Sequence, residues 1–245
     1  MPGTVSVDLW YPGKDNLPSP VTEGADVRPW HNRDGAYITR SAVEAWRRQG
    51  RLYLANAGTI TTPITFGAGD ILETEPDLDV SVPEGHMIIP LFVKVVLEGI
   101  GTSAQLEGMI AYGAGTPGAR TGGTVARISN MRTNSGRASA LNNSPSLTTH
   151  GIYSNVDSGG ATYQTLNVAE LHRWRVEMTV DIVTAIDTSS HPKVEFVYSY
   201  LTDAPPPEIV GGSGANYGRL NVFLASQAGT GFITLVYAEF GPGEF

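Results

Sequence analysis

The chain has 245 residues, of which 41% are hydrophobic and 16% are charged, and its formal net charge is −8. This composition supplies enough apolar material for a core and excludes a disordered chain. An acidic chain is a poor ligand for polyphosphate, whose binding depends on Lys and Arg, so we expect no direct nucleic-acid binding. The chain has no cysteine, which excludes disulfides and thiolate metal ligands.

The first 50 residues predict an irregular arm followed by one short helix. Residues 1–38 carry many prolines and few periodic apolar positions, which indicates an extended segment. Ser41 and Glu44 then form a capping box, and Gly50 stands where a glycine commonly ends a helix. We therefore expect a helix of about two turns between them.

From residue 51 onward the pattern is strand and turn. Apolar and polar side chains alternate most clearly along residues 172–183, which fits the period of a strand with one buried face and is typical of antiparallel sheets. Glycine and proline are concentrated between such runs, as turns require. The predicted strands are residues 51–55, 60–66, 78–82, 88–97, 105–112, 124–128, 161–168, 172–183, 194–201, 219–225 and 232–240.

These elements predict an all-β fold in one large domain. We expect residues 1–50 to form an N-terminal arm with the short helix, and residues 51–245 to form the β-domain. A jelly-roll sandwich of two antiparallel sheets and a closed barrel both fit the strand pattern. The long connections at residues 113–123 and 203–218 favour the jelly-roll sandwich, because a meander barrel needs only short turns.

Acidic residues gather between residues 70 and 84. Asp70, Asp77 and Asp79 offer the hard oxygen ligands that Ca²⁺ prefers, and they are the candidates for a structural calcium site. Their spacing matches no EF-hand loop, and a solvated acidic face explains the same residues. We expect no other cofactor.

The middle of the chain is locally cationic. Residues 108–156 contain no Asp or Glu, whereas Arg120, Arg127, Arg132 and Arg137 all lie within them. The stacking aromatic residues of a single-strand nucleic-acid site are missing between these arginines. We interpret the four arginines as a contact with the acidic segment of a second copy; simple solvent exposure is the alternative.

No catalytic motif accompanies the strands, and we expect a protein that is not an enzyme. The five histidines are far apart, without the close pair of a transition-metal site. A glycoside hydrolase using paired carboxylates such as Glu177 and Glu195 is one alternative. A carbohydrate-binding or receptor-binding module, with Tyr153, Tyr163 and Tyr217 as exposed aromatic contacts, is the other.

Three segments carry a resemblance to a known class of protein. Residues 50–56 (GRLYLAN) are followed by TTPITF at 61–66, DVSVPEGHMIIPL at 79–91 looks like a turn feeding a buried strand, and ITLVYAEF at 233–240 looks like a closing strand. Together with the arm, the helix and the long loops, this pattern resembles the single jelly-roll capsid proteins of icosahedral viruses.

The resemblance implies a viral, bacteriophage-like capsid subunit that assembles into a shell and resides in the virion. Its partners would be copies of itself and other capsid proteins, and synthesis would take place in the host cytoplasm.

The first residues lack the basic stretch and apolar core of a signal peptide. The longest apolar run, residues 87–97, is about half the roughly 20 residues of a membrane helix, so we expect no membrane span.

Overall fold

The computed structural model of the protein describes most of the chain after the N-terminal arm. The described residues are 41–66, 71–72, 75–99, 105–115, 121–142, 150–157, 167–177, 195–212, 217–225 and 229–245. Residues 43–245 form one compact unit, to which nearly all described residues belong. The arm predicted at residues 1–38 lies outside the described residues.

The predicted helix is present as α1, Ala42–Arg48. It ends in a Schellman motif: the Gly50 amide donates to the Arg47 carbonyl (3.0 Å) and the Arg51 amide to the Trp46 carbonyl (2.9 Å). Gly50 has a φ of 71°, a conformation that glycine adopts without strain. The chain can therefore turn directly from the helix into the first strand.

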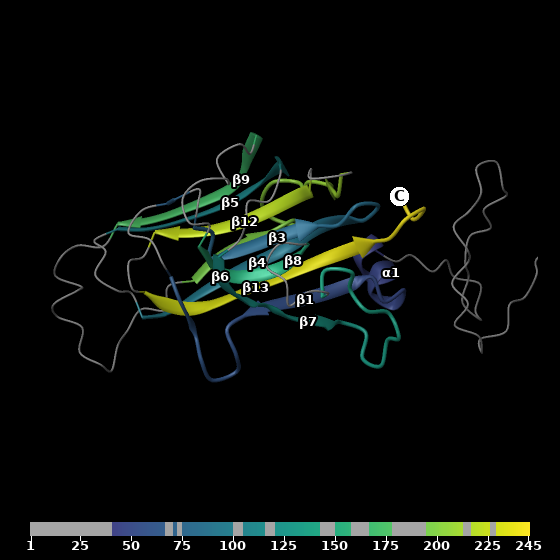
Figure 1. Cartoon of the computed structure of the whole chain (residues 1–245), viewed down its shortest axis with the longest axis horizontal. Helices are drawn as coiled ribbons and strands as arrows, with labels where there is room; N and C mark the ends of the chain where they lie inside the picture. Colours follow the sequence, from purple (N-terminus) through teal and green to yellow (C-terminus); the bar gives the residue numbers. More distant parts are fainter. Residues whose placement is uncertain are drawn as a thin grey trace, which may run out of the picture. The chain divides into compact units, whose positions relative to one another are not determined.

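The strands form two antiparallel sheets that pack face to face (Figure 1). The seven-stranded sheet has the order β10-β4-β13-β1-β7, with β11 paired to β4 and β2 to β13; the six-stranded sheet has the order β6-β8-β3-β12-β5-β9. The strands are β1 (Leu52–Ala57), β2 (Ile64–Thr65), β3 (Leu78–Val82), β4 (Met87–Gly99), β5 (Gln105–Gly115), β6 (Thr121–Val125), β7 (Arg127–Asn130), β8 (Gly151–Asp157), β9 (Asn167–Glu177), β10 (Glu195–Ser199), β11 (Ile209–Val210), β12 (Tyr217–Ala225) and β13 (Thr230–Phe240).

The pairing of the long strands is that of a jelly roll. The first pairs with the last and the others follow inward: β1 with β13, β3 with β12, β4 with β10, and β5 with β9. β13 also pairs with β4, which joins the β1–β13 and β4–β10 pairs in one sheet. β12 also pairs with β5, which joins the β3–β12 and β5–β9 pairs in the other sheet. A long hairpin wound across two sheets in this way is the jelly-roll arrangement. The predicted all-β antiparallel sandwich is confirmed, and the closed barrel is not formed.

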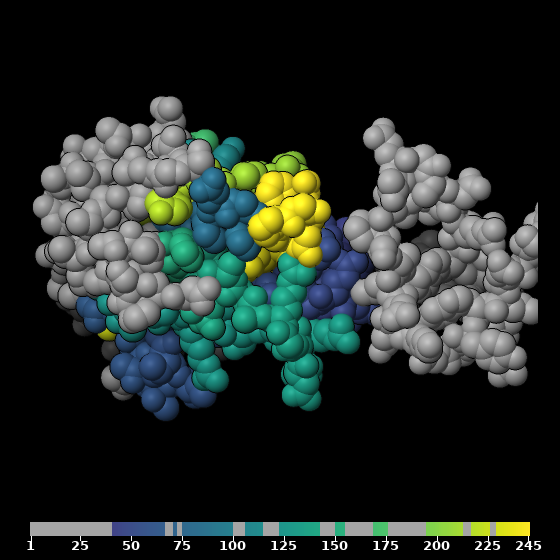
Figure 2. All heavy atoms as spheres, turned by 45° about the vertical axis from the view of Figure 1, so that its right-hand side comes forward, coloured from purple at the N-terminus to yellow at the C-terminus, as the bar shows by residue number. Residues whose placement is uncertain are grey.

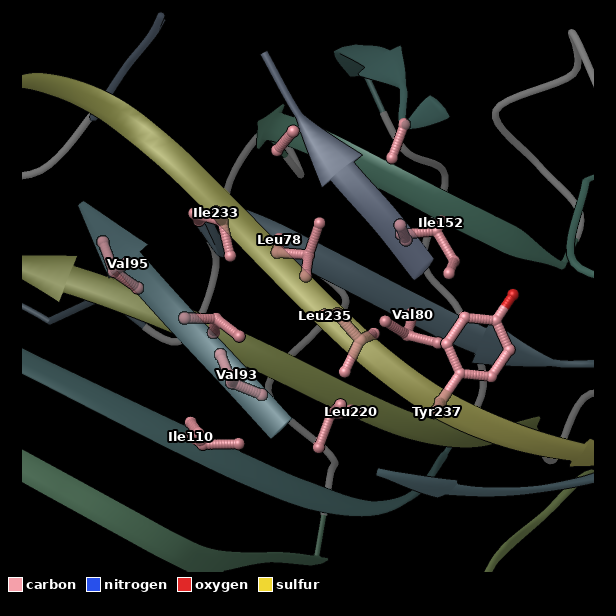
Figure 3. Packing of buried hydrophobic residues seen from close by; sticks show 14 of the residues in the cluster. Leu78, Val80, Val93, Val95, Ile110, Ile152, Leu220, Ile233, Leu235 and Tyr237 are labelled. Atoms are coloured by element: carbon pink, nitrogen blue, oxygen red, sulfur yellow. The ribbon is translucent and has the colours of Figure 1, made fainter. Parts of the chain in front are cut away.

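One hydrophobic core fills the space between the sheets. Alternate residues of facing strands point into it, as Val93, Val95 and Leu235 do from the seven-stranded sheet and Leu220 from the six-stranded sheet (Figure 3). Each of these side chains is fully buried. Because successive side chains of a strand point to opposite faces, the alternation in the sequence was sufficient to identify this face of the sheets.

A second, smaller cluster lies on the outer face of the seven-stranded sheet. Its buried members are Leu52, Met87, Ile89, Leu91, Ala238 and Phe240. Helix α1 packs against it through Val43 and Trp46, and the Trp46 ring meets the Phe240 ring edge-on at 5.4 Å. The helix therefore shields one end of this face from solvent.

The two sheets are joined along both sides. β6 pairs with β8 in one sheet, β7 pairs with β1 in the other, and the chain passes between them at the buried Ala126. On the opposite side the Trp174 indole N–H of β9 donates to the Val197 carbonyl of β10 (3.0 Å). This bond covers a backbone acceptor at the edge of β10.

Several predicted strands differ in detail from the observed ones. β8 and β11 were not predicted, and the strand predicted at residues 60–66 is reduced to β2. The single strand predicted at residues 124–128 is divided between β6 and β7, because the chain changes sheets there. β9 covers part of two predicted strands, and the remainder of both lies outside the described residues.

Candidate functional site

The candidate calcium ligands that the structure describes are buried and engaged within the chain. Asp79 is 0% exposed and forms an ion pair with Arg219, itself 1% exposed, at 2.6 Å. One carboxylate oxygen of Asp77 accepts a hydrogen bond from the Leu224 amide (2.7 Å). Asp70 lies outside the described residues, and within those described no group of three or more His, Asp or Glu side chains could hold a metal. The calcium site therefore stays a prediction.

Two of the four predicted contact arginines are bonded within their own chain. Arg132 donates to the carbonyl of Arg48 at the end of α1 (2.5 Å), and Arg137 forms an ion pair with the Glu244 carboxylate. Arg127 is exposed on the edge strand β7, and Arg120 lies outside the described residues. Because Asp77 and Asp79 are buried, they cannot supply charge to a contact with a second copy.

A connected group of polar side chains lies at the end of the sandwich where β13 finishes. We call it the end cluster; it consists of Arg51, Tyr53, Asn130, Arg137, Ser139, Tyr237, Glu239 and Glu244. Residues 131–142, which follow β7, pass over this end. In Figure 2 this teal segment meets the yellow end of the chain and the purple helix α1. The cluster thus joins three parts of the chain that are far apart in sequence.

The buried carboxylate of Glu239 fixes one end of this loop. It accepts a hydrogen bond from the Ser139 hydroxyl (2.5 Å) and another from the Ala140 amide (2.9 Å). The Ser139 oxygen also accepts from the Leu141 amide (3.1 Å) and lies 2.9 Å from the Tyr237 hydroxyl. The Ser139 hydroxyl donates its proton in a hydrogen bond to Glu239, and its oxygen lone pairs are engaged by the other contacts. Ser139 therefore holds the loop in place and is not arranged as a nucleophile.

Two tyrosines lie beneath the loop. The rings of Tyr53 and Tyr237 stack with centroids 5.6 Å apart. Burial raises the pKa of the Tyr237 hydroxyl well above its ordinary value, and the nearby Glu239 charge adds to the rise. Burial likewise raises the pKa of Tyr53, while Arg137 opposes the shift. Both hydroxyls therefore remain protonated at neutral pH and act as polar ends of core side chains.

Glu244 fixes the middle of the loop. Its carboxylate accepts two hydrogen bonds from Arg137 (3.0 and 2.5 Å), one from Arg51 (3.3 Å) and one from the Gly241 amide (2.7 Å). The bonds from Arg137 lower the pKa of Glu244 to about 2, and burial opposes the shift. The same contact raises the pKa of Arg137. The pair is therefore fully charged across the ordinary pH range.

Of the residues considered for glycan chemistry, the structure describes some in positions that do not suit it. Tyr153 is fully buried and cannot contact a ligand; Tyr163 lies outside the described residues and Tyr217 is half-buried. Glu195 pairs with Lys94 at 3.0 Å. Its strand β10 and the strand that carries Glu177, β9, belong to different sheets, so the two residues do not lie on adjacent strands of one sheet.

The outer face of the seven-stranded sheet beyond α1 carries cross-strand rows of side chains, which we call the outer-face rows. The strand register aligns Phe92, Val236 and Leu54 in one apolar row, and Val96 with Phe232 in another. Between them lies a row with Val197, Lys94, Thr234, Asn56 and Arg127. Apart from the exposed Val197 and Arg127, these side chains are half-buried. The face therefore combines apolar surface with a central polar line.

Comparison with known proteins gives no relative. No protein-family model matches the chain, and a search of curated proteins found no match. Within the described part of the chain, no helix has the length and apolar character that crossing a bilayer requires.

Proposed function

We propose that the chain is a structural protein, a capsid subunit of a bacteriophage-like virus that assembles with copies of itself into an icosahedral shell. The jelly-roll pairing, from β1 with β13 inward to β5 with β9, carries this proposal. Viral capsid proteins are among the established users of this architecture, alongside lectins and cupins. Two packed sheets joined along both sides form a rigid block, which suits a shell subunit.

The outer-face rows are the surface we assign to contacts between copies. Two rows of half-buried apolar side chains flank a polar line, and Lys94 of that line pairs with Glu195, which lies beside Val96 in one of the apolar rows. Partly exposed apolar side chains grouped on one face of a folded domain support a protein contact there. The ion pair and the neighbouring Thr234 and Asn56 supply the polar groups that fix the register of such a contact.

Sedimentation over a range of protein concentrations tests the proposal with a matched pair of variants. Val197 on β10 and Val125 on β6 are edge-strand valines with similar exposure, 38% and 43%, on different sheets. We expect the unaltered chain and Val125→Arg to assemble, and Val197→Arg to remain in small species, because its charge would be buried at the contact. A chain that stays monomeric at every concentration would overturn the capsid function, and a monomer that binds glycans would favour the carbohydrate-binding alternative. Equal assembly of both variants would overturn the assigned surface.

A further inference from the structure

The carboxylate of Glu244 is bound by donors from three separate parts of the chain. Arg137 comes from the loop after β7, Arg51 precedes β1, and the Gly241 amide follows β13. Arg137 holds both carboxylate oxygens, the paired geometry in which guanidinium binds carboxylate most strongly and selectively. Two cations and a backbone donor converging on one carboxylate form an arrangement specific for that group.

The backbone of each donor residue is held by contacts other than those with Glu244. The Arg51 amide bonds to the end of α1, its carbonyl accepts from the Glu239 amide (2.8 Å), and its guanidinium lies 5.1 Å from the centre of the Phe240 ring. The carbonyl of Arg137 accepts from the Asn130 side chain (3.2 Å). Gly241 is buried directly after β13. Arg51 and the Gly241 amide would therefore stay in place if Glu244 moved away, and the Arg137 side chain would be released.

Glu244 itself lies on a segment with little other attachment. Pro242 and Gly243 are exposed, and Phe245 is 57% exposed. Gly243 has a φ of 75°, so the segment turns at a residue that rotates with little steric restriction. The Glu244 amide donates to the Gly241 carbonyl (3.1 Å), a bond within the segment, whereas the Glu244 carboxylate connects the segment to Arg51 and Arg137.

We propose that Arg51, Arg137 and the Gly241 amide form a carboxylate-binding site, and that Glu244 fills it as a releasable latch over residues 131–142. Closed, the latch holds Arg137 and the middle of the loop in one conformation. Open, it leaves two arginines and a backbone donor facing solvent, ready to bind an acidic side chain of another peptide. This inference stands independently of the capsid function.

Hydrogen exchange of residues 133–138 tests the latch. In Glu244→Gln the neutral amide loses the charged contacts, and we expect exchange in this segment to rise about tenfold, the factor equivalent to about 1.4 kcal/mol. The exposed Glu84, replaced by Gln, is the matched control and should leave exchange unchanged. Exchange in the core strands should match the unaltered chain in both variants. Unchanged loop exchange in Glu244→Gln would overturn the latch.

Binding of a short peptide tests the site. The peptide Gly-Pro-Gly-Glu-Phe, acetylated at its N-terminus and amidated at its C-terminus, should bind Glu244→Gln saturably and restore loop protection, whereas the same peptide with Gln in place of Glu should not. The unaltered chain, with its site filled, should bind neither peptide. Equal binding of the two peptides, or no binding of the acidic one, would overturn the carboxylate site.

A salt titration keeps the inference testable if the variant does not fold. Raising the salt from about 0.1 M to about 1 M shortens the Debye length from ~10 to ~3 Å. In the unaltered chain this should increase exchange at residues 133–138 relative to residues 139–142, which the buried Glu239 holds. An equal response of the two segments would contradict the latch.

Discussion

The ion pair between Asp79 and Arg219 gives the strongest stability prediction. The two residues lie on the paired strands β3 and β12, their charged groups are 2.6 Å apart, and both side chains are almost completely buried. Asp79→Asn keeps the size of the side chain but removes the Asp79 charge from beside the buried Arg219 cation. Removing one partner of a buried pair costs about 3–5 kcal/mol, a large part of the roughly 5–15 kcal/mol that stabilises a typical domain.

Replacing both partners separates the charge effect from the loss of packing. In the double variant Asp79→Leu with Arg219→Met neither charge of this pair remains, so we expect a smaller loss of stability than in Asp79→Asn. Urea unfolding followed by far-UV circular dichroism gives the free energy of unfolding by linear extrapolation. The more exposed Lys94–Glu195 pair is the control, and Glu195→Gln should cost less than about 1 kcal/mol.

Two results would contradict a stabilising role for the Asp79–Arg219 charge pair. If Asp79→Asn unfolds within about 0.5 kcal/mol of the unaltered chain, the pair contributes no more than a surface contact does. If the double variant is less stable than Asp79→Asn, shape and hydrogen bonding at this position outweigh the cost of an isolated buried charge. Either outcome would show that the Asp79–Arg219 charge pair is not what holds β3 and β12 together on this face.

Three further predictions follow from the site and the strand contacts. Because the pKa of Glu244 is lowered to about 2, its pairing stabilises the fold above about pH 4.5 and is lost as the pH falls toward 2, so thermal melting of Glu244→Gln and the unaltered chain should converge in acid. A Cβ at Gly231 would lie 2.2 Å from a backbone carbonyl of β4, whereas one at Gly136 would meet nothing within 4 Å. Gly231→Ala should therefore lower the free energy of unfolding by about 1–3 kcal/mol, measured by urea unfolding. Gly136→Ala is the control, and equal stability of the two variants would contradict the close approach of the strands at Gly231. Trp174→Phe removes the bond to the β10 carbonyl and should cost about 1 kcal/mol by the same measurement, and a neutral effect would show that this bond does not stabilise the side of the sandwich.

The buried faces of most strands could be predicted from the sequence because they follow a period of two. Along β12, Leu220, Val222 and Leu224 occupy every second position, with Arg219 and Asn221 among the residues at the alternate positions, and all three lie in the core. β8 escaped prediction because its two large apolar residues Ile152 and Tyr153 are neighbours and are followed by the polar Ser154 and Asn155, so the segment does not alternate. The prediction depends on alternation with a period of two.

Polar residues were harder to place than apolar ones. Asp79 and Arg219 occupy the positions of their strands that face away from the core, where alternation predicts solvent, yet both are buried. Nothing in the local sequence indicates that these outward-facing positions are buried. The calcium and contact hypotheses both treated Asp77 and Asp79 as available surface charge. The partner of Arg137 is Glu244, 107 residues further along the chain, so the pairing depends on the fold and has no local signal.

Electron cryomicroscopy of the purified chain tests whether it assembles into a capsid. We expect closed particles with icosahedral symmetry, whose repeating density accommodates the two-sheet jelly roll with the outer-face rows at the contacts between copies. Single dispersed chains at every concentration, or an assembly in which that face points to solvent, would contradict it.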